Sequence, residues 1–169
     1  MQKYIPLILL FSFLNIFSQE PEKSIKKDTL KKSKKAKLPL KVDRKINLKT
    51  DEGTWMSLDI SPDGKTIAFD MLGDIYTLPI DGGKATRITS GLAFDTHPKF
   101  SPNGKELLIV SDRSGGPNAW ILDLENNDST QVTKGDDYFM ETAEWTNDGE
   151  YVISTKGGRN SKLFLNHKS

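Results

Sequence analysis

A short turn motif recurs three times in the C-terminal two thirds of this 169-residue chain. The copies are Ser61-Pro62-Asp63-Gly64, Ser101-Pro102-Asn103-Gly104 and the looser Thr146-Asn147-Asp148-Gly149. Their glycines are spaced by 40 and then 45 residues. Self-similarity at such a period indicates an array of similar units, each of which buries a face against its neighbour. The chain is therefore expected to fold as repeats, not around one irregular core.

Each motif is a tight-turn signal, and strand-like runs follow it. Proline pre-sets φ for the turn, Asp or Asn tolerates the next position, and glycine accepts a positive φ. The expected strands are Thr66–Asp70, Asp74–Ile80 and Ala85–Thr89; Glu106–Val110, Asn118–Leu124 and Thr130–Thr133; Tyr151–Ser154 and Lys162–Leu165. Four short antiparallel strands per repeat are typical of a propeller blade. The predicted fold class is all-β, a partial β-propeller of about two and a half four-stranded blades.

The first residues indicate export. Lys3 precedes an almost wholly apolar run, Tyr4–Phe17, which ends abruptly at Ser18. This run is shorter than the roughly 20 residues of a spanning helix and is typical of a signal peptide. We predict a signal peptide at 1–18, a periplasmic or secreted location, and no transmembrane span after cleavage. A buried N-terminal helix is the alternative.

Residues 19–49 are predicted to form a disordered basic linker ahead of the blades at 50–169. The formal charge is +9 for residues 21–49 and −8 for residues 50–169. The linker has too few apolar residues to offset its chain entropy. No aromatic residue interleaves the lysines as a base-stacking surface requires, so no nucleic-acid partner is expected. A solvated tether is favoured over docking on an anionic membrane or on the chain's own acidic part.

Several segments resemble a known family. Ser-Pro-Asp-Gly-Lys at 61–65 and the runs at 74–83 and 111–116 resemble repeats of TolB-like, WD-type β-propellers. Residues 52–57 resemble the lead into the N-terminal propeller of exported bacterial amidohydrolase-related proteins. This second resemblance implies a non-catalytic propeller that gates or scaffolds a downstream metal-dependent amidohydrolase domain, a C–N hydrolase holding a divalent metal such as zinc. The alternatives are a TolB-type protein-binding module in the periplasm, with an envelope protein as partner, and the propeller of a prolyl-oligopeptidase-like serine peptidase.

Catalytic signatures are missing from the sequence. The chain has no cysteine, and its two histidines, His97 and His167, do not form the His-x-His pair of an amidohydrolase metal site. No Gly-x-Ser-x-Gly elbow occurs either. We therefore expect no catalytic residue, cofactor or metal site in this chain, and whether a parent protein is an enzyme stays open. Because propellers close with about 4–8 blades, the expected partners are the missing blades or a downstream hydrolase domain of a longer protein.

Three alternating residues, Asp95, His97 and Lys99, are the candidate ligand contacts facing a propeller channel. The alternative is that His97 bonds its neighbours and holds a blade corner. The acidic run at 135–144 lacks the ligand spacing of a calcium loop and is interpreted as a solvated face. A tryptophan lies near each repeat, and Trp55, Trp120 and Trp145 are all predicted to belong to the blade cores.

Overall fold

The computed structural model describes residues 47–135, 140, 142–157 and 160–169. The predicted signal peptide and nearly all of the predicted linker lie outside these residues. The strands described below all lie in one compact unit, Leu48–Ser169. Within the described residues, no helix is long and apolar enough to cross a membrane.

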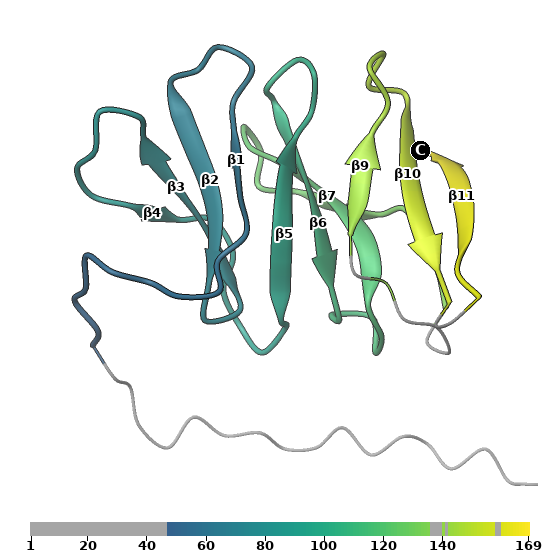
Figure 1. Ribbon diagram of the computed structural model, residues 1–169, viewed down its shortest axis with the longest axis horizontal. Coiled ribbons are helices and arrows are strands. Elements are labelled where there is room, and N and C mark those ends of the chain that lie inside the picture. The colour runs from purple at the N-terminus through teal and green to yellow at the C-terminus, as the bar shows by residue number, and fades with distance from the viewer. Residues whose placement is uncertain (1–46, 136–139, 141, 158–159) are drawn as a thin grey trace, which may run out of the picture. The chain divides into compact units, whose positions relative to one another are not determined.

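The described residues form three antiparallel sheets, drawn side by side in Figure 1. Each sheet is a run of consecutive strands, so neighbouring strands are hairpin partners. The first blade contains β1 Leu58–Ile60, β2 Thr66–Met71, β3 Asp74–Pro79 and β4 Thr86–Arg87; the second contains β5 Asp95–Phe100, β6 Glu106–Ser111, β7 Asn118–Asp123 and β8 Ser129–Gln131; the third contains β9 Ala143–Trp145, β10 Tyr151–Lys156 and β11 Lys162–His167. The predicted all-β partial propeller is confirmed, with β4 and β8 shorter than expected.

The repeated motif forms the turn between the first two strands of each blade. In the first turn, the Ser61 hydroxyl accepts a hydrogen bond from the Thr66 N–H at 2.9 Å and donates one to Asp63 at 2.6 Å. The Gly64 N–H donates to the Ser61 carbonyl at 2.8 Å, and Gly64 has a φ of 70°. Glycine adopts this left-handed conformation without steric cost. The same contacts recur in the other two turns, so local chemistry fixes the hairpin that starts each blade.

Strand β6 shows how the blades stack. Its side chains alternate between the two faces of the sheet, because successive residues of a strand point to opposite sides. Leu107 and Ile109 belong to a core cluster shared with the first blade, and Leu108 and Val110 belong to one shared with the third. All four are at most 5% exposed. Burial of one such side chain stabilises the fold by about 1.5–3 kcal/mol, so β6 anchors both junctions.

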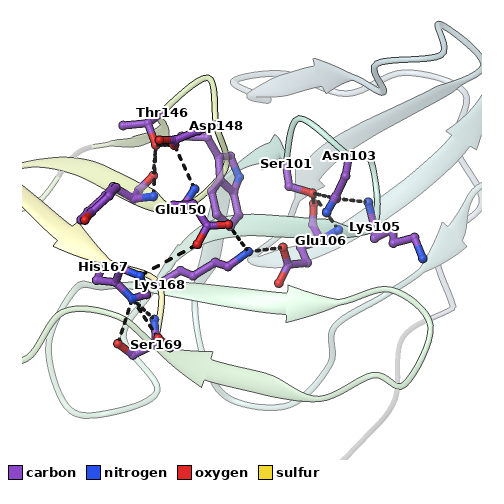
Figure 2. A network of polar contacts seen from close by, with 12 residues as sticks. Ser101, Asn103, Lys105, Glu106, Thr146, Asp148, Glu150, His167, Lys168 and Ser169 are labelled. Carbon is purple, nitrogen blue, oxygen red and sulfur yellow. Dashed lines mark hydrogen bonds and ion pairs between the residues drawn. The ribbon is translucent and has the colours of Figure 1, made fainter.

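Polar contacts also fix how neighbouring blades are aligned on one another. The Asp59 carboxylate accepts a hydrogen bond from the Phe100 N–H at 2.7 Å, joining the first blade to the second. The Trp145 indole N–H donates to the Lys99 carbonyl at 3.1 Å, joining the second to the third. At the end of β11, Lys168 reaches Glu106 of the second blade, with 3.9 Å between nitrogen and oxygen (Figure 2). Each blade is thus tied to the next by a hydrogen bond or an ion pair besides its core.

Candidate binding site at the junction of the first two blades

Strand β5 contains a bulge that decides where the predicted site residues lie. Its pairing with β6 shifts register between Thr96 and Lys99, and His97 within the bulge has a φ of 55°. A bulge adds an unpaired residue and re-aims the side chains around it. The His97 N–H accordingly points out of its own sheet and donates to the Asp70 carboxylate of the first blade at 2.9 Å. The alternation assumed from the sequence is interrupted here.

The three predicted ligand contacts consequently have separate surroundings. Asp95 is 1% exposed, and its carboxylate accepts a hydrogen bond from the Arg113 guanidinium at 2.8 Å. Lys99 points toward the third blade, where its ammonium lies 3.0 Å from the Glu144 carboxylate. His97 borders a pocket at the junction of the first two blades, together with Asp70. Lys99 lines a different pocket, among residues of all three blades. Ligand contact by Asp95, His97 and Lys99 stays a prediction. Of the three residues, His97 is the one that the geometry favours most as a ligand contact.

Asp70, at the end of β2, forms the polar floor of this region. Its side chain is buried and accepts two backbone hydrogen bonds, from Ser57 at 3.1 Å and from His97 at 2.9 Å. Hydrogen bonds to a charged acceptor are stronger than those between neutral groups. One carboxylate therefore fixes the segment leading into β1 and the bulge of β5 on the neighbouring blade.

A pocket of about 420 Å³ lies above this floor. Its rim carries large apolar side chains that face solvent: Trp55 is fully exposed, Leu72 is 80% exposed and Phe94 is 61% exposed. Trp55 was expected in the blade core, and that prediction is wrong. Trp55 lies in the coil before β1, and among the described residues no second sheet packs over its ring. Trp120 and Trp145 do pack against the two core clusters, as predicted.

Backbone strain is concentrated around the same pocket. Trp55, Leu72 and His97 have φ values of 62°, 54° and 55°, a region that side chains other than glycine seldom adopt. Such conformations cost about 1–3 kcal/mol each and cluster at binding sites. In addition, His97 Nδ1 is buried and has no hydrogen-bond partner among the described residues. The pocket therefore combines an apolar rim with three strained backbone positions.

Sequence reasoning reached His97 but missed the apolar rim. A signal was present, because Leu72 and Phe94 are large apolar residues in segments between the predicted strands. Residues 55, 72, 94 and 97 come together only because two blades pack on each other. Their spacing in the sequence does not indicate that they line one pocket. Within the described residues, no group of three or more His, Asp or Glu side chains is placed to hold a metal ion. The acidic run at 135–144 falls largely on residues outside the described part.

Antiparallel sheets of consecutive hairpin strands, stacked face to face on shared cores, define this chain as a set of β-propeller blades with a solvent-facing pocket at a blade junction. The comparison with known families gives the particular assignment. The chain belongs to the TolB beta propeller domain family, which matches residues 31–168.

Individual relatives agree with this assignment. The chain is 30% identical over 97 residues to Tricorn protease homolog 1 of Streptomyces coelicolor, covering 57% of this chain and 9% of that protein. It is 27% identical over 119 residues to the Tol-Pal system protein TolB of Helicobacter hepaticus, covering 68% and 28%. The crystal structure of TolB from Acinetobacter baumannii superposes with a TM-score of 0.56 at 28% identity, covering 64% and 29%. The chain thus spans less than a third of each of these proteins.

Proposed function

We propose that this chain is a TolB-type protein-binding propeller module that acts outside the cytoplasm. Its binding surface is the pocket bordered by Trp55, Leu72, Phe94 and His97. The observation that carries the proposal is the exposure of three large apolar side chains around one pocket. Soluble domains seldom leave such groups together in water without a partner.

The chemistry of the pocket suits an apolar segment of a partner protein. Aromatic rings such as Trp55 and Phe94 supply large contact areas with few rotatable bonds, and residues of this kind dominate binding energy at protein interfaces. The fitting ligand is a short peptide segment with an aromatic or branched apolar anchor.

Export is the second component of the proposal. It rests on the apolar run Tyr4–Phe17 behind Lys3, which has the length and flank of a signal peptide. The similarity to a Tol-Pal system protein supports a role in the cell envelope. The partner would then be another exported or envelope protein.

A peptide-display selection on the immobilised chain tests the binding role. We expect enriched peptides to share an aromatic or branched apolar anchor, and we expect Trp55→Ala and Phe94→Ala to weaken their binding by more than about tenfold in calorimetric titrations. The matched control is Leu92→Ala, because Leu92 is also a large exposed residue, 71% in solvent, but does not line the pocket. Absence of a shared anchor, or equal loss of binding in the control, would contradict the proposal.

A second candidate is the gating or scaffolding of an amidohydrolase domain in a longer protein. The observation that favours it is that Trp55 lies within 52–57, the segment that carries the amidohydrolase resemblance, and that its ring is open to contact. A downstream domain would then occupy the pocket instead of a separate protein. Reading the gene past residue 169 tests this candidate, which requires a His-x-His-bearing domain. A Gly-x-Ser-x-Gly elbow would favour a serine peptidase instead.

A further inference from the structure

A buried carboxylate lies at the floor of the pocket between the first two blades. Asp70 is 6% exposed and lines this pocket. Each of its oxygens accepts one backbone N–H: Oδ1 accepts that of Ser57 at 3.1 Å, and Oδ2 accepts that of His97 at 2.9 Å. These two bonds occupy about half of the acceptor positions of a carboxylate. The floor of the pocket therefore presents a negatively charged acceptor to any ligand that enters.

The charge of Asp70 is not balanced by a basic side chain of the described residues, because none forms an ion pair with it. The two arginines nearest to the pocket lining are paired with other carboxylates. Arg113 lies 2.8 Å from Asp95, and Arg87 lies 3.6 Å from Asp74. The electrostatic field at the floor of the pocket consequently favours a positive charge.

The rim of the pocket also suits a cation with an apolar stem. Trp55 and Phe94 expose aromatic rings, and the face of such a ring attracts a cation within about 6 Å of its centroid. The backbone N–H of Phe94 donates to the carboxylate of Asp112 at 2.8 Å, which places a second negative charge beside the rim. Leu72 adds aliphatic surface at the same rim. The rim and the floor together match a long basic side chain.

From this arrangement we propose that the pocket recognises a lysine or arginine side chain next to the apolar anchor of a bound peptide. The inference rests on the peptide-binding function proposed above and specifies which peptides the site takes. The alkyl stem of the basic residue lies along Leu72 and Phe94, and its cationic end reaches the Asp70 carboxylate. Long basic side chains commonly bury their stems on apolar surface in this way.

The burial of Asp70 makes this contact selective. An ion pair that forms out of water normally requires the desolvation of both charges. Folding has already removed Asp70 from water, so binding adds only the desolvation of the cation of the ligand. Exposed ion pairs change affinity by about fivefold at most. At this partly enclosed site we expect a basic residue to be preferred over a neutral residue of similar shape by about tenfold or more.

Two probe peptides that differ in charge test the proposal. Acetylated and amidated Gly-Lys-Leu-Lys-Gly places a lysine on each side of a leucine anchor. In the matched probe, norleucine replaces both lysines, which keeps most of the alkyl stem and removes the charge. Titrations of the purified chain, followed by the NMR signal of the Trp55 indole N–H, give both dissociation constants. We expect the lysine peptide to bind about tenfold or more tightly, although the norleucine peptide is the more apolar of the two.

The variant Asp70→Asn tests whether the preference comes from Asp70. Its amide keeps one acceptor oxygen but carries no charge. A structural change in the pocket weakens both peptides alike, whereas loss of the charge weakens only the lysine peptide. The ratio of the two dissociation constants should therefore fall to about one. In the control Asp81→Asn, at an exposed aspartate outside the pocket, the ratio should stay as in the unsubstituted chain.

Circular dichroism establishes that each variant is folded, and if Asp70→Asn is not, the comparison of the two probes on the unsubstituted chain decides. Equal or tighter binding of the norleucine peptide would overturn the inference and leave the apolar-anchor function standing. A preference that survives in folded Asp70→Asn would also overturn it, because the preference would then come from the overall acidity of the blades. Displayed peptides that share an apolar anchor but no basic residue beside it would have the same meaning. If no peptide binds at the pocket, the proposed function itself fails.

Discussion

The carboxylate of Asp70 gives the sharpest test of how the first two blades are joined. It is 6% exposed and accepts the backbone N–H groups of Ser57 and His97. Replacing Asp70 with alanine leaves both donors without this acceptor. The segment before β1 and the bulge of β5 then lose their common attachment, although the apolar core of the junction is untouched.

The expected loss follows from the two hydrogen bonds. A hydrogen bond to a charged group contributes about 1.5–3 kcal/mol, but part of that is recovered where water reaches the freed donors. Because the Ser57 and His97 N–H groups are only partly buried, we expect Asp70→Ala to lower the free energy of unfolding by about 2–4 kcal/mol. Asp70→Asn should lose about half of that, since its single amide oxygen can replace only one of the two carboxylate oxygens.

Urea unfolding followed by tryptophan fluorescence measures the effect. The matched control is Asp81→Ala, because Asp81 is an exposed aspartate in the loop after β3. Surface substitutions of that kind usually change stability by no more than about 0.5 kcal/mol. The reasoning is refuted if Asp70→Ala falls within that margin of the control, or if Asp70→Asn is as damaging as alanine.

Three further outcomes are expected. Leu108→Ala should lower the free energy of unfolding by about 2–5 kcal/mol in the same urea assay, because Leu108 is fully buried between two blades; a loss under about 1 kcal/mol would contradict the packing. Trp145→Phe removes the indole hydrogen bond to Lys99 and should cost about 0.5–1.5 kcal/mol; an unchanged urea midpoint would show that the bond adds nothing. The hydrogen bond from the Ser61 hydroxyl holds the pKa of Asp63 below its ordinary value. The ionised carboxylate therefore stabilises the fold at neutral pH, and this stabilisation is lost as the pH falls below about 4. Asp63→Asn should accordingly reduce the fall of the melting temperature at acid pH. An unchanged fall of the melting temperature in the variant would exclude this contribution of Asp63.

The local architecture was predictable from the sequence. Ser61 and its counterparts bond to the backbone of their own turn, and Gly64 takes its positive φ within the same four residues. Strands of alternating apolar residues follow at once, so the blades and their order could be derived from short-range chemistry and the repeat period. Family resemblance added the TolB assignment, which the match over residues 31–168 confirms.

The candidate site was predictable only in part. His97 was predicted as a ligand contact together with Asp95 and Lys99, on the assumption that the three side chains alternate along a regular strand. The bulge in β5 interrupts this alternation, and no local feature of the sequence indicates the bulge. Trp55 was placed in a core although its ring faces solvent. The error at Trp55 arises because a repeat indicates that each blade meets a neighbour but not which loop residues that neighbour leaves uncovered.

For this protein, the sequence by itself determined the turns, the strands and their grouping into blades, because each depends on contacts within a few residues or on a repeated period. Only the tertiary structure decided the pocket at the junction of the first two blades. The carboxylate of Asp70 meets the N–H of His97 across 27 residues of chain, and Asp59 meets Phe100 across 41. Contacts at such separations are set by how one sheet lies on the next, and that stacking is a property of the assembled blades.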